Sequence, residues 1–198
     1  MPDMTKKTRV RAAVAGEPVD RVPVGLWGHD YLRESEPHEL VAQTVEAYRE
    51  NDWDFVKFNP RAGYFAEAWG NLYSTPEAQQ SPRMVSAIIE SAADLGSVTP
   101  VDPYTGVFGD HLYALRMLAD EIGSEVDIIH TIFSPLSVAA LLCGPRTEFR
   151  ELAAEDPAAA HGAVQAVEET LTEYAVAALT VGASGIFFAP LGWSSRDT

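Results

Sequence analysis

Cysteine is almost absent from this sequence, and its scarcity excludes two kinds of structural support. Cys143 is the only cysteine, so the chain cannot form an internal disulfide bond. Its neighbours, Ala-Leu-Leu-Cys-Gly, predict a small buried side chain. No cluster of histidine and cysteine has the spacing of a zinc site, so we expect no metal centre in this sequence.

Long apolar segments are also missing. No run approaches the roughly 18 apolar residues that a membrane-spanning helix needs. The basic segment 1–11 is not followed by the apolar stretch of a secretory signal. We therefore expect a cytoplasmic protein without a membrane partner.

Positive charge is scarce, since 14 lysine and arginine residues face 29 aspartate and glutamate residues and the net charge is −15. A surface of this sign repels nucleic acids and anionic membranes, so we expect neither as a partner. We attribute the acidic excess to a solvated surface rather than to a cationic ligand. The few cations are therefore informative, and those near the predicted site are Arg21, Arg33, Lys57 and Arg61.

What the sequence does contain is a regular alternation of strands and helices. Apolar, β-prone segments at 23–27, 55–58, 126–133 and 185–189 predict strands. The predicted helices are 8–14, 39–49, 84–90, 112–121, 135–143 and a long helix that opens at Asp156-Pro157 and ends at Gly182. Residues 71–107, rich in proline, serine and glycine, are predicted to form an irregular excursion around one short helix.

Strands that alternate with helices indicate a parallel sheet. The sequence supplies roughly four βα units, whereas a closed (β/α)₈ barrel typically needs about 250 residues. The predicted fold class is therefore α/β, a TIM (β/α)₈-type barrel. Residues 1–198 are expected to form one partial barrel domain, about its N-terminal half.

Residues 54–70 are the most informative segment. The segment begins as a buried strand and breaks at Asn59-Pro60 into a loop that carries Arg61, Tyr64 and Glu67. Backbone beyond a strand is free of the sheet, so side chains there can converge on a ligand, as they do at the carboxyl ends of barrel strands. We therefore expect the site at this end of the sheet.

Four stretches of the chain resemble the uroporphyrinogen decarboxylase superfamily, which includes corrinoid-dependent methyltransferase relatives. They are residues 16–24 (Gly-Glu-Pro-Val-Asp-Arg-Val-Pro-Val), 54–70, 133–138 (Phe-Ser-Pro-Leu-Ser-Val) and 182–186 (Gly-Ala-Ser-Gly-Ile). Their order and spacing carry the resemblance, which covers nearly the whole chain but only the N-terminal half of the family. It implies a distorted TIM barrel with a deep cleft at the carboxyl ends of the strands.

The resemblance implies a carboxy-lyase that uses no cofactor and acts on a carboxylated small molecule. The decarboxylase holds an acidic tetrapyrrole with arginines, and a loop aspartate stabilises the positive charge that develops on the protonated pyrrole. A comparison without gaps places Arg61 at the position of that aspartate. An arginine there repels the same intermediate, so we do not expect uroporphyrinogen itself to be the substrate.

Other departures from the family pattern agree. The arginine-containing substrate loop after the first strand is replaced by Gly28-His29-Asp30, and the expected tyrosine falls at Leu141. Pro190-Leu191-Gly192 replaces the Asp-Ser-Trp motif of the fourth strand. The methyltransferase relatives place their His-x-Cys zinc site in the half of the family that this sequence does not cover. A corrinoid-linked, methyltransferase-like function is therefore the alternative to the lyase.

The predicted catalytic residues are His29, Asp30 and Arg61. His29 and Asp30 can act as an acid/base pair, because imidazole titrates near neutral pH and a carboxylate can orient it. Adjacent residues need not face each other, so the alternative is a turn capped by Asp30 with His29 exposed. Arg61 either binds a carboxylate in fork geometry or pairs with Glu67.

The predicted substrate-binding residues are Lys57, Asn59, Tyr64, Ser134, Trp193 and Ser194. Lys57 lies within an apolar strand, where an unpaired charge is costly, so it points into the barrel mouth or extends to its edge. Tyr64 and Trp69 either flank a flat ligand or belong to the core. His111 and His130 are expected to be structural.

A third possibility is a truncated half-barrel that has no chemistry of its own and needs a partner chain. An open half-barrel exposes strand edges and an apolar interior, which favour association. We therefore predict that this chain alone is a homo-oligomer, or requires a complementary C-terminal half to fold well. Sedimentation measures this directly, and a monodisperse monomer that unfolds cooperatively contradicts it.

Overall fold

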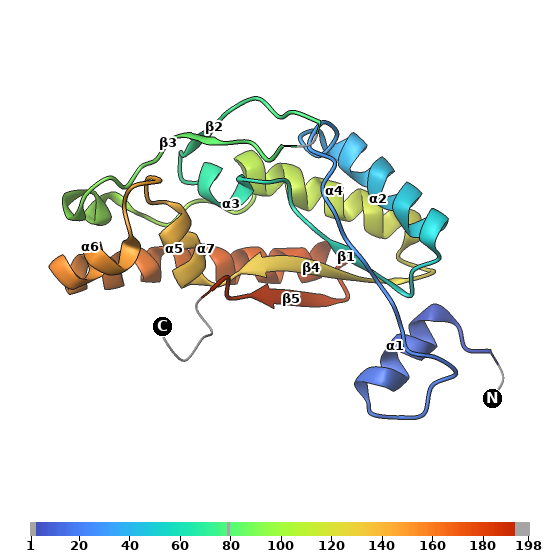
Figure 1. The fold of residues 1–198 in the computed structure, drawn as a ribbon. Coiled ribbons are helices and arrows are strands. Elements are labelled where there is room, and N and C mark those ends of the chain that lie inside the picture. Colours follow the sequence, from blue (N-terminus) through green and yellow to red (C-terminus); the bar gives the residue numbers. More distant parts are fainter. Residues whose placement is uncertain (1–2, 79, 193–198) are drawn as a thin grey trace.

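The structure, a computed structural model, describes residues 3–78 and 80–192 (Figure 1). Their order is helix α1 (Lys6–Val14), helix α2 (Pro37–Asn51), strand β1 (Phe55–Phe58), helix α3 (Tyr64–Glu67), strand β2 (Leu72–Tyr73), strand β3 (Met84–Ser86), 3₁₀-helix η1 (Ala92–Ser97), helix α4 (Gly106–Ile122), strand β4 (Asp127–Phe133), helix α5 (Pro135–Leu141), helix α6 (Phe149–Glu155), helix α7 (Pro157–Val181) and strand β5 (Gly185–Ala189).

The main sheet is parallel, with the strand order β1-β4-β5. Lys57 lies opposite Ile129, and Ile129 opposite Gly185, so the three strands share one register. The α/β class and the parallel sheet predicted from the sequence are confirmed. A second sheet of only two short strands, β2 and β3, is antiparallel.

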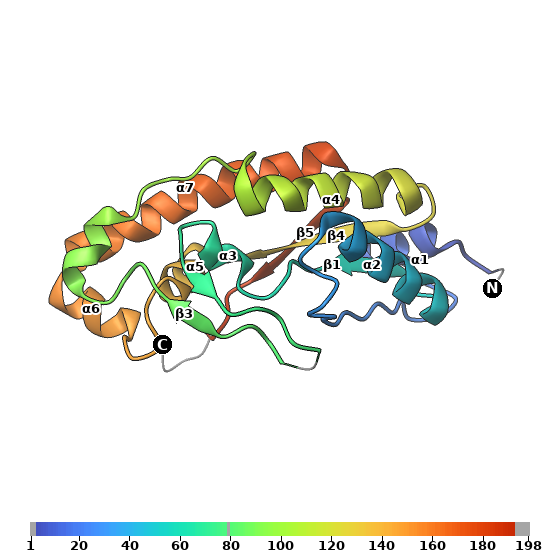
Figure 2. The ribbon, with the colours of Figure 1, turned by 90° about the horizontal axis from the view of Figure 1, so that it is seen from above.

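Helices α4 and α7 lie side by side along one face of the sheet (Figure 2). The side chains that alternate toward this face, among them Val56, Phe58 and Ile128, are fully buried. They meet apolar residues of both helices, such as Leu115 and Val167, which are equally buried. The core therefore occupies one side of the sheet, and the side chains on the opposite face do not contribute to it.

The long helix follows its predicted caps. The Asp156 side chain accepts a hydrogen bond from the Ala159 amide at 3.0 Å, Pro157 occupies the first turn, and the helix ends at Gly182. The first amides of a helix have no partner within it. Asp156 binds one of them and Pro157 lacks one, so the sequence alone predicts where this helix begins. Helix α6 was not predicted.

The predicted strand at 23–27 is wrong, because the segment is extended but joins no sheet. Pro23 has no amide hydrogen, and the Val24 amide donates to the Asp54 carboxylate at 2.8 Å rather than to a neighbouring strand. The Val24 carbonyl still accepts a bond from the Asp54 amide at 2.7 Å. Gly25 permits this approach, since a Cβ there would lie 2.7 Å from the Phe55 carbonyl oxygen.

The predicted helix at 84–90 is also wrong. Residues 84–86 form strand β3, and the amides that follow are bound to other partners. The Ile88 amide donates to the Asn71 side chain at 2.9 Å, and the Ile89 amide donates to the Leu142 carbonyl at 3.2 Å. These tertiary hydrogen bonds hold the chain extended and leave no helical ladder.

Strand β5 is apolar, as predicted, but is not covered on both faces. Phe187 and Phe188 are 42% and 59% exposed, on opposite sides of the strand. Within residues 3–78 and 80–192, β5 is an edge of the sheet. No helix in this part of the chain combines the length and the apolar character that a bilayer span requires.

A buried carboxylate fixes the amino end of the sheet. Asp54, immediately before β1, is fully buried and accepts bonds from Arg9 at 2.7 Å and from Arg21 at 2.9 Å. Burial alone raises the pKa of this carboxyl group, but the Val24 amide and the two guanidinium groups outweigh it, so the pKa is lowered. Arg9 also binds Asp20 at 2.6 Å. Residues 16–24 thus supply Asp20, Arg21 and the Val24 amide to this cluster.

Replacement of Asp54 by asparagine is expected to destabilise the fold strongly. The variant keeps the side-chain volume but removes the charge that Arg21 binds and one of the two carboxylates that balance Arg9, which keeps only Asp20. Breaking such a buried ion pair costs up to about 3–5 kcal/mol. Urea unfolding measures the loss. The matched control is Asp120→Asn, which breaks an exposed Arg116–Asp120 pair on α4 and is expected to have little effect. Equal effects of the two substitutions contradict the role given to Asp54.

Candidate functional site

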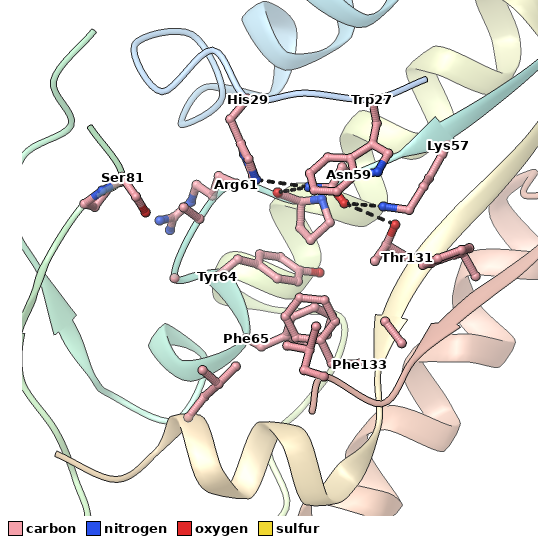
Figure 3. Close-up of a pocket in the computed structure, with 18 of the residues that line it drawn as sticks. Trp27, His29, Lys57, Asn59, Arg61, Tyr64, Phe65, Ser81, Thr131 and Phe133 are labelled. Atoms are coloured by element: carbon pink, nitrogen blue, oxygen red, sulfur yellow. Dashed lines mark hydrogen bonds between the residues drawn. The ribbon is translucent and has the colours of Figure 1, made fainter. Parts of the chain in front are cut away.

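A cavity of about 330 Å³ opens where β1, β4 and β5 end (Figure 3). Its side chains come from the loop after β1, from the sheet face opposite α4 and α7, and from the extended segment before α2. The lining residues are Trp27, His29, Lys57, Asn59, Pro60, Arg61, Ala62, Gly63, Tyr64, Phe65, Tyr73, Ser81, Pro82, Thr131, Phe133, Leu141, Phe187, Ala189 and Leu191.

The strand register explains which side chains reach the cavity. Side chains alternate along a strand, so Lys57 and Asn59 share the face opposite the core. Thr131 and Phe187 lie opposite each other on β4 and β5 and point to the same side. Phe65 stacks on Phe133 with ring centroids 4.5 Å apart and gives the cavity an apolar wall.

Lys57 is the most unusual group in the cavity. The residue is only 9% exposed, and its Nζ lies 3.9 Å from the ring centroid of Trp27 and 4.6 Å from that of Phe187. No carboxylate in the described parts of the chain forms an ion pair with it. Burial therefore lowers the pKa of Lys57 to about 8. Of the two alternatives for Lys57, the barrel mouth or its edge, the structure favours the first, because the side chain lines the cavity.

Asn59 connects the polar groups of the cavity. Its Oδ1 accepts bonds from Lys57 Nζ at 2.9 Å and from Thr131 Oγ1 at 3.3 Å, and its Nδ2 lies 3.4 Å from His29 Nε2 (Figure 3). One amide thus links two strands of the sheet to the segment before α2. These contacts orient the Lys57 amine and the His29 imidazole toward the same part of the cavity.

His29 is paired with Glu34 rather than with Asp30. His29 Nδ1 lies 2.6 Å from Glu34 Oε2, and the other Glu34 oxygen accepts the Ala62 amide at 2.9 Å. Asp30 instead caps the following turn, since its side chain accepts the Leu32 amide at 3.3 Å. Because Glu34 is only 4% exposed, a buried carboxylate orients the imidazole toward Asn59.

Arg61 lines the cavity and forms an ion pair with Glu67. Both side chains are largely buried, with 24% and 19% exposure, so the pair is not an ordinary surface salt bridge. Burial raises the pKa of Glu67, although Arg61 opposes the shift. The guanidinium group thus stands at the cavity wall with one carboxylate partner.

Tyr64 and Trp69 are placed mainly in the core. The Tyr64 hydroxyl is hydrogen-bonded to that of Tyr174, and the residue is 1% exposed, although its ring touches the cavity. Trp69 donates to the Thr99 carbonyl at 2.9 Å and does not line the cavity. Gly63, with φ of 84°, starts α3, and a Cβ there would lie 3.0 Å from the Tyr73 ring.

Ser134 is placed outside the cavity, because its hydroxyl caps α5 by accepting the Ser137 amide at 3.2 Å. Trp193 and Ser194, also predicted to bind substrate, lie outside the described residues. The described residues hold no group of three or more histidine, cysteine, aspartate or glutamate side chains arranged for a metal ion. Leu141, at the position of the family's tyrosine, does line the cavity.

The sequence interpretation did not assign Trp27, Thr131 or Phe187 to the site, nor Glu34, which orients His29. Trp27 and Phe187 were assigned only to strands, and Thr131 lies inside an apolar run. The register of β4 against β1 identifies Thr131 as a neighbour of Asn59, but sequence alone does not give this register. Glu34 carries no local signal of burial, because acidic residues are common in exposed turns.

A buried polar cluster lies behind the sheet, between β4 and the helices. The Tyr174 hydroxyl lies 3.0 Å from His130 Nε2 and 3.3 Å from His111 Nδ1. Burial lowers the pKa of His130 to about 3, and burial together with the neighbouring His130 lowers that of His111 well below its usual value. Both imidazoles are therefore neutral and belong to the core.

The structure is that of an α/β protein with a cavity at the carboxyl end of its parallel sheet, the position at which such sheets commonly bind ligands. Residues 5–196 match the family model described as uroporphyrinogen decarboxylase (URO-D). The chain therefore belongs to the uroporphyrinogen decarboxylase family, as the resemblance in its sequence indicated.

Two proteins similar to this chain are methyltransferases. The methylcobamide:CoM methyltransferase MtbA of Methanosarcina mazei is 24% identical over 157 residues, which cover 73% of this chain and 46% of the relative. A solved methyltransferase from Methanosarcina mazei has a TM-score of 0.76 at 22% identity, covering 93% of this chain and 58% of that structure. The chain thus spans about half the length of these relatives, and the structural likeness shows the fold.

The buried histidines predict a loss of stability in mild acid. The unfolded chain protonates a histidine near pH 6.5, whereas folded His130 does so only near pH 3. Between these values the unfolded state binds more protons, so the free energy of unfolding falls as the pH falls, by about 2 kcal/mol for His130 from pH 7 to pH 5. Urea unfolding at both values measures the change.

The variant His130→Gln is expected to remove this part of the pH dependence, because glutamine keeps a polar group but does not titrate. His161→Gln is the matched control, since His161 is exposed on α7. A pH dependence that is the same in wild type and His130→Gln contradicts the assignment.

Proposed function

We propose that the cavity binds a small anionic substrate of a corrinoid-linked methyl transfer. The observation that carries the proposal is the charge of the cavity wall. In a chain of net charge −15, the described lining contains Lys57, Arg61 and His29 but no aspartate or glutamate. A cavity of this composition favours a carboxylate or sulfonate and disfavours a cation.

The same charge argues against decarboxylation of uroporphyrinogen. That reaction requires negative charge opposite a protonated pyrrole, and the described lining offers cations instead. Membership of the family does not decide between a lyase and a methyltransferase, because the family resemblance includes both kinds of enzyme. MtbA is a methyltransferase, and this likeness supports the same class of reaction for the present chain.

When bound, a methylcorrinoid would supply an electrophilic methyl group to a nucleophilic atom of the acceptor. The acceptor atom loses a proton when it is a thiol. His29, which Glu34 orients at 2.6 Å, would accept that proton. Arg61 would hold the acidic group of the acceptor at the opposite wall.

The cavity mouth suits a flat partner. Trp27, Phe187 and Leu191 line the cavity and are 52%, 42% and 46% exposed, so they present an apolar rim. A corrinoid has a broad apolar face that can pack on such a rim. The residues of this chain would bind and orient the acceptor.

We further propose that the parallel sheet is an arc of a (β/α)₈ barrel. The relatives are about twice as long as the matched region, and β5 exposes phenylalanine side chains on both faces. A complementary half or a second copy of the chain that covers these side chains would complete the cavity wall.

Calorimetric titration of the full chain with 2-mercaptoethanesulfonate, a small thiol with a sulfonate group, tests the anion site. Binding is expected to be at least about 10-fold tighter than that of uncharged 2-mercaptoethanol, since a charged hydrogen bond contributes roughly 1.5–3 kcal/mol. Arg61→Gln is expected to remove most of the difference. Glu67→Gln, which frees Arg61 from its ion pair, is expected to retain or increase it.

Arg116→Gln is the matched control, because Arg116 lies exposed on α4 outside the cavity. Loss of methylcobalamin absorbance in the presence of the thiol reports methyl transfer itself. Equal affinity for the charged and uncharged thiols contradicts the anion site. Release of carbon dioxide from uroporphyrinogen III contradicts the choice of methyl transfer over decarboxylation.

A further inference from the structure

The amine of Lys57 has an environment suited to covalent chemistry. Its Nζ lies in the cavity between the rings of Trp27 and Phe187, and its only hydrogen bond in the described structure goes to Asn59 at 2.9 Å. One side-chain amide leaves the lone pair of the neutral amine available to a ligand. The cavity of about 330 Å³ gives a small molecule access to it.

The chain contains only two other lysines, and both are differently placed. Lys6 forms an ion pair with Asp52 at 2.8 Å, and Lys7 binds the Gly123 carbonyl and lies 3.8 Å from Asp127. These contacts stabilise the ammonium form. Lys57 is thus distinguished from every other lysine of the protein by the absence of an acidic partner in the described structure.

The charged groups around Lys57 come from several elements. Arg61 and His29 share its cavity, and Glu34 stands behind His29. The neighbouring cavity between residues 26–34 and α2, which Lys57 also touches, is lined on its charged side by Asp30, Arg33, Glu34, Glu46 and Glu50. None of these carboxylates lies within 4.0 Å of the Lys57 amine, so burial dominates its environment.

We propose that Lys57 is a nucleophile whose amine adds to the carbonyl carbon of a small 2-oxo acid or aldehyde acid in the cavity and forms an imine. The carbonyl provides the electrophile, and the acidic group provides the charge that Arg61 can bind. The inference goes beyond methyl transfer and does not depend on it. It assigns covalent chemistry to a residue that the proposed methyl transfer leaves without a chemical role.

The reaction balances without any further reactant. The lone pair of Nζ forms a bond to the carbonyl carbon, the carbonyl π bond breaks, and the oxygen takes up the proton that the nitrogen releases. A second proton, donated by His29 in its imidazolium form, then lets this hydroxyl group leave as water. The nitrogen lone pair closes the C=N bond, and the resulting iminium cation lies between the same two aromatic rings.

The availability of the free amine supports this chemistry. With a pKa of about 8, roughly a tenth of Lys57 is unprotonated at pH 7. An ordinary lysine has on the order of 300-fold less free amine at that pH. A weaker base is also a weaker nucleophile, so part of this advantage is lost, and a net gain on the order of 10-fold remains.

Reductive trapping tests the proposal on the intact chain. The protein is incubated with glyoxylate or with acetaldehyde in the presence of cyanoborohydride, and peptide mapping gives the rate of labelling at each lysine and at the terminal amine. Lys57 is expected to be labelled about 10-fold faster than Lys6 or Lys7 at pH 7. Its rate is expected to rise with a midpoint near pH 8 and to be higher with glyoxylate than with acetaldehyde.

The wild-type lysines act as internal controls, so the comparison does not depend on any variant folding. Lys57→Arg and Lys57→Met are expected to remove only the label at residue 57, with thermal unfolding used to monitor the fold. Labelling of Lys57 that is no faster than that of Lys6 and Lys7 overturns the proposal that Lys57 is a nucleophile. Equal rates of Lys57 labelling by glyoxylate and acetaldehyde overturn the proposal that the ligand carries an acidic group.

Discussion

The buried carboxylate of Asp54 is the interaction on which the arrangement of the other elements depends. It stands at the start of β1 and binds both Arg9 from α1 and Arg21 from the extended segment. A buried charge without partners is too costly to persist, so the two guanidinium groups must be present whenever β1 is in place. The carboxylate therefore couples α1, the extended segment and the sheet.

This coupling reaches the site through the chain itself. The Asp54 carboxylate takes the Val24 amide, which removes residues 23–27 from the sheet ladder. The extended segment then runs beside β1 and brings Trp27 over the Lys57 amine and His29 to the Asn59 side chain. An interaction at the amino end of the sheet thus positions groups at its carboxyl end.

The same residues show which features of the fold and the site can be predicted from sequence. The caps of α7 at Asp156 and Gly182 and the apolar run of β1 are local signals, and the structure agrees with them. The predicted strand at 23–27 failed because Val24 has a side-chain partner 30 residues away. In the site, Lys57 was found by its polarity within an apolar strand, whereas Glu34 and Thr131 are defined by register and turn geometry, which no local pattern records.

The cavity requires an explanation for keeping Lys57 buried without an acidic partner. Burial of the ammonium group is unfavourable, and the two aromatic rings offset only part of that cost. An acid nearby would stabilise the charge, but it would also compete with an anionic ligand and hold the amine protonated. The carboxylate-free wall serves both proposed roles, because at neutral pH the protonated majority attracts an anion while the unprotonated minority can react with its carbonyl. One desolvated lysine therefore contributes, beside Arg61, to the anion site we propose and supplies the nucleophile of the chemistry we assign to it.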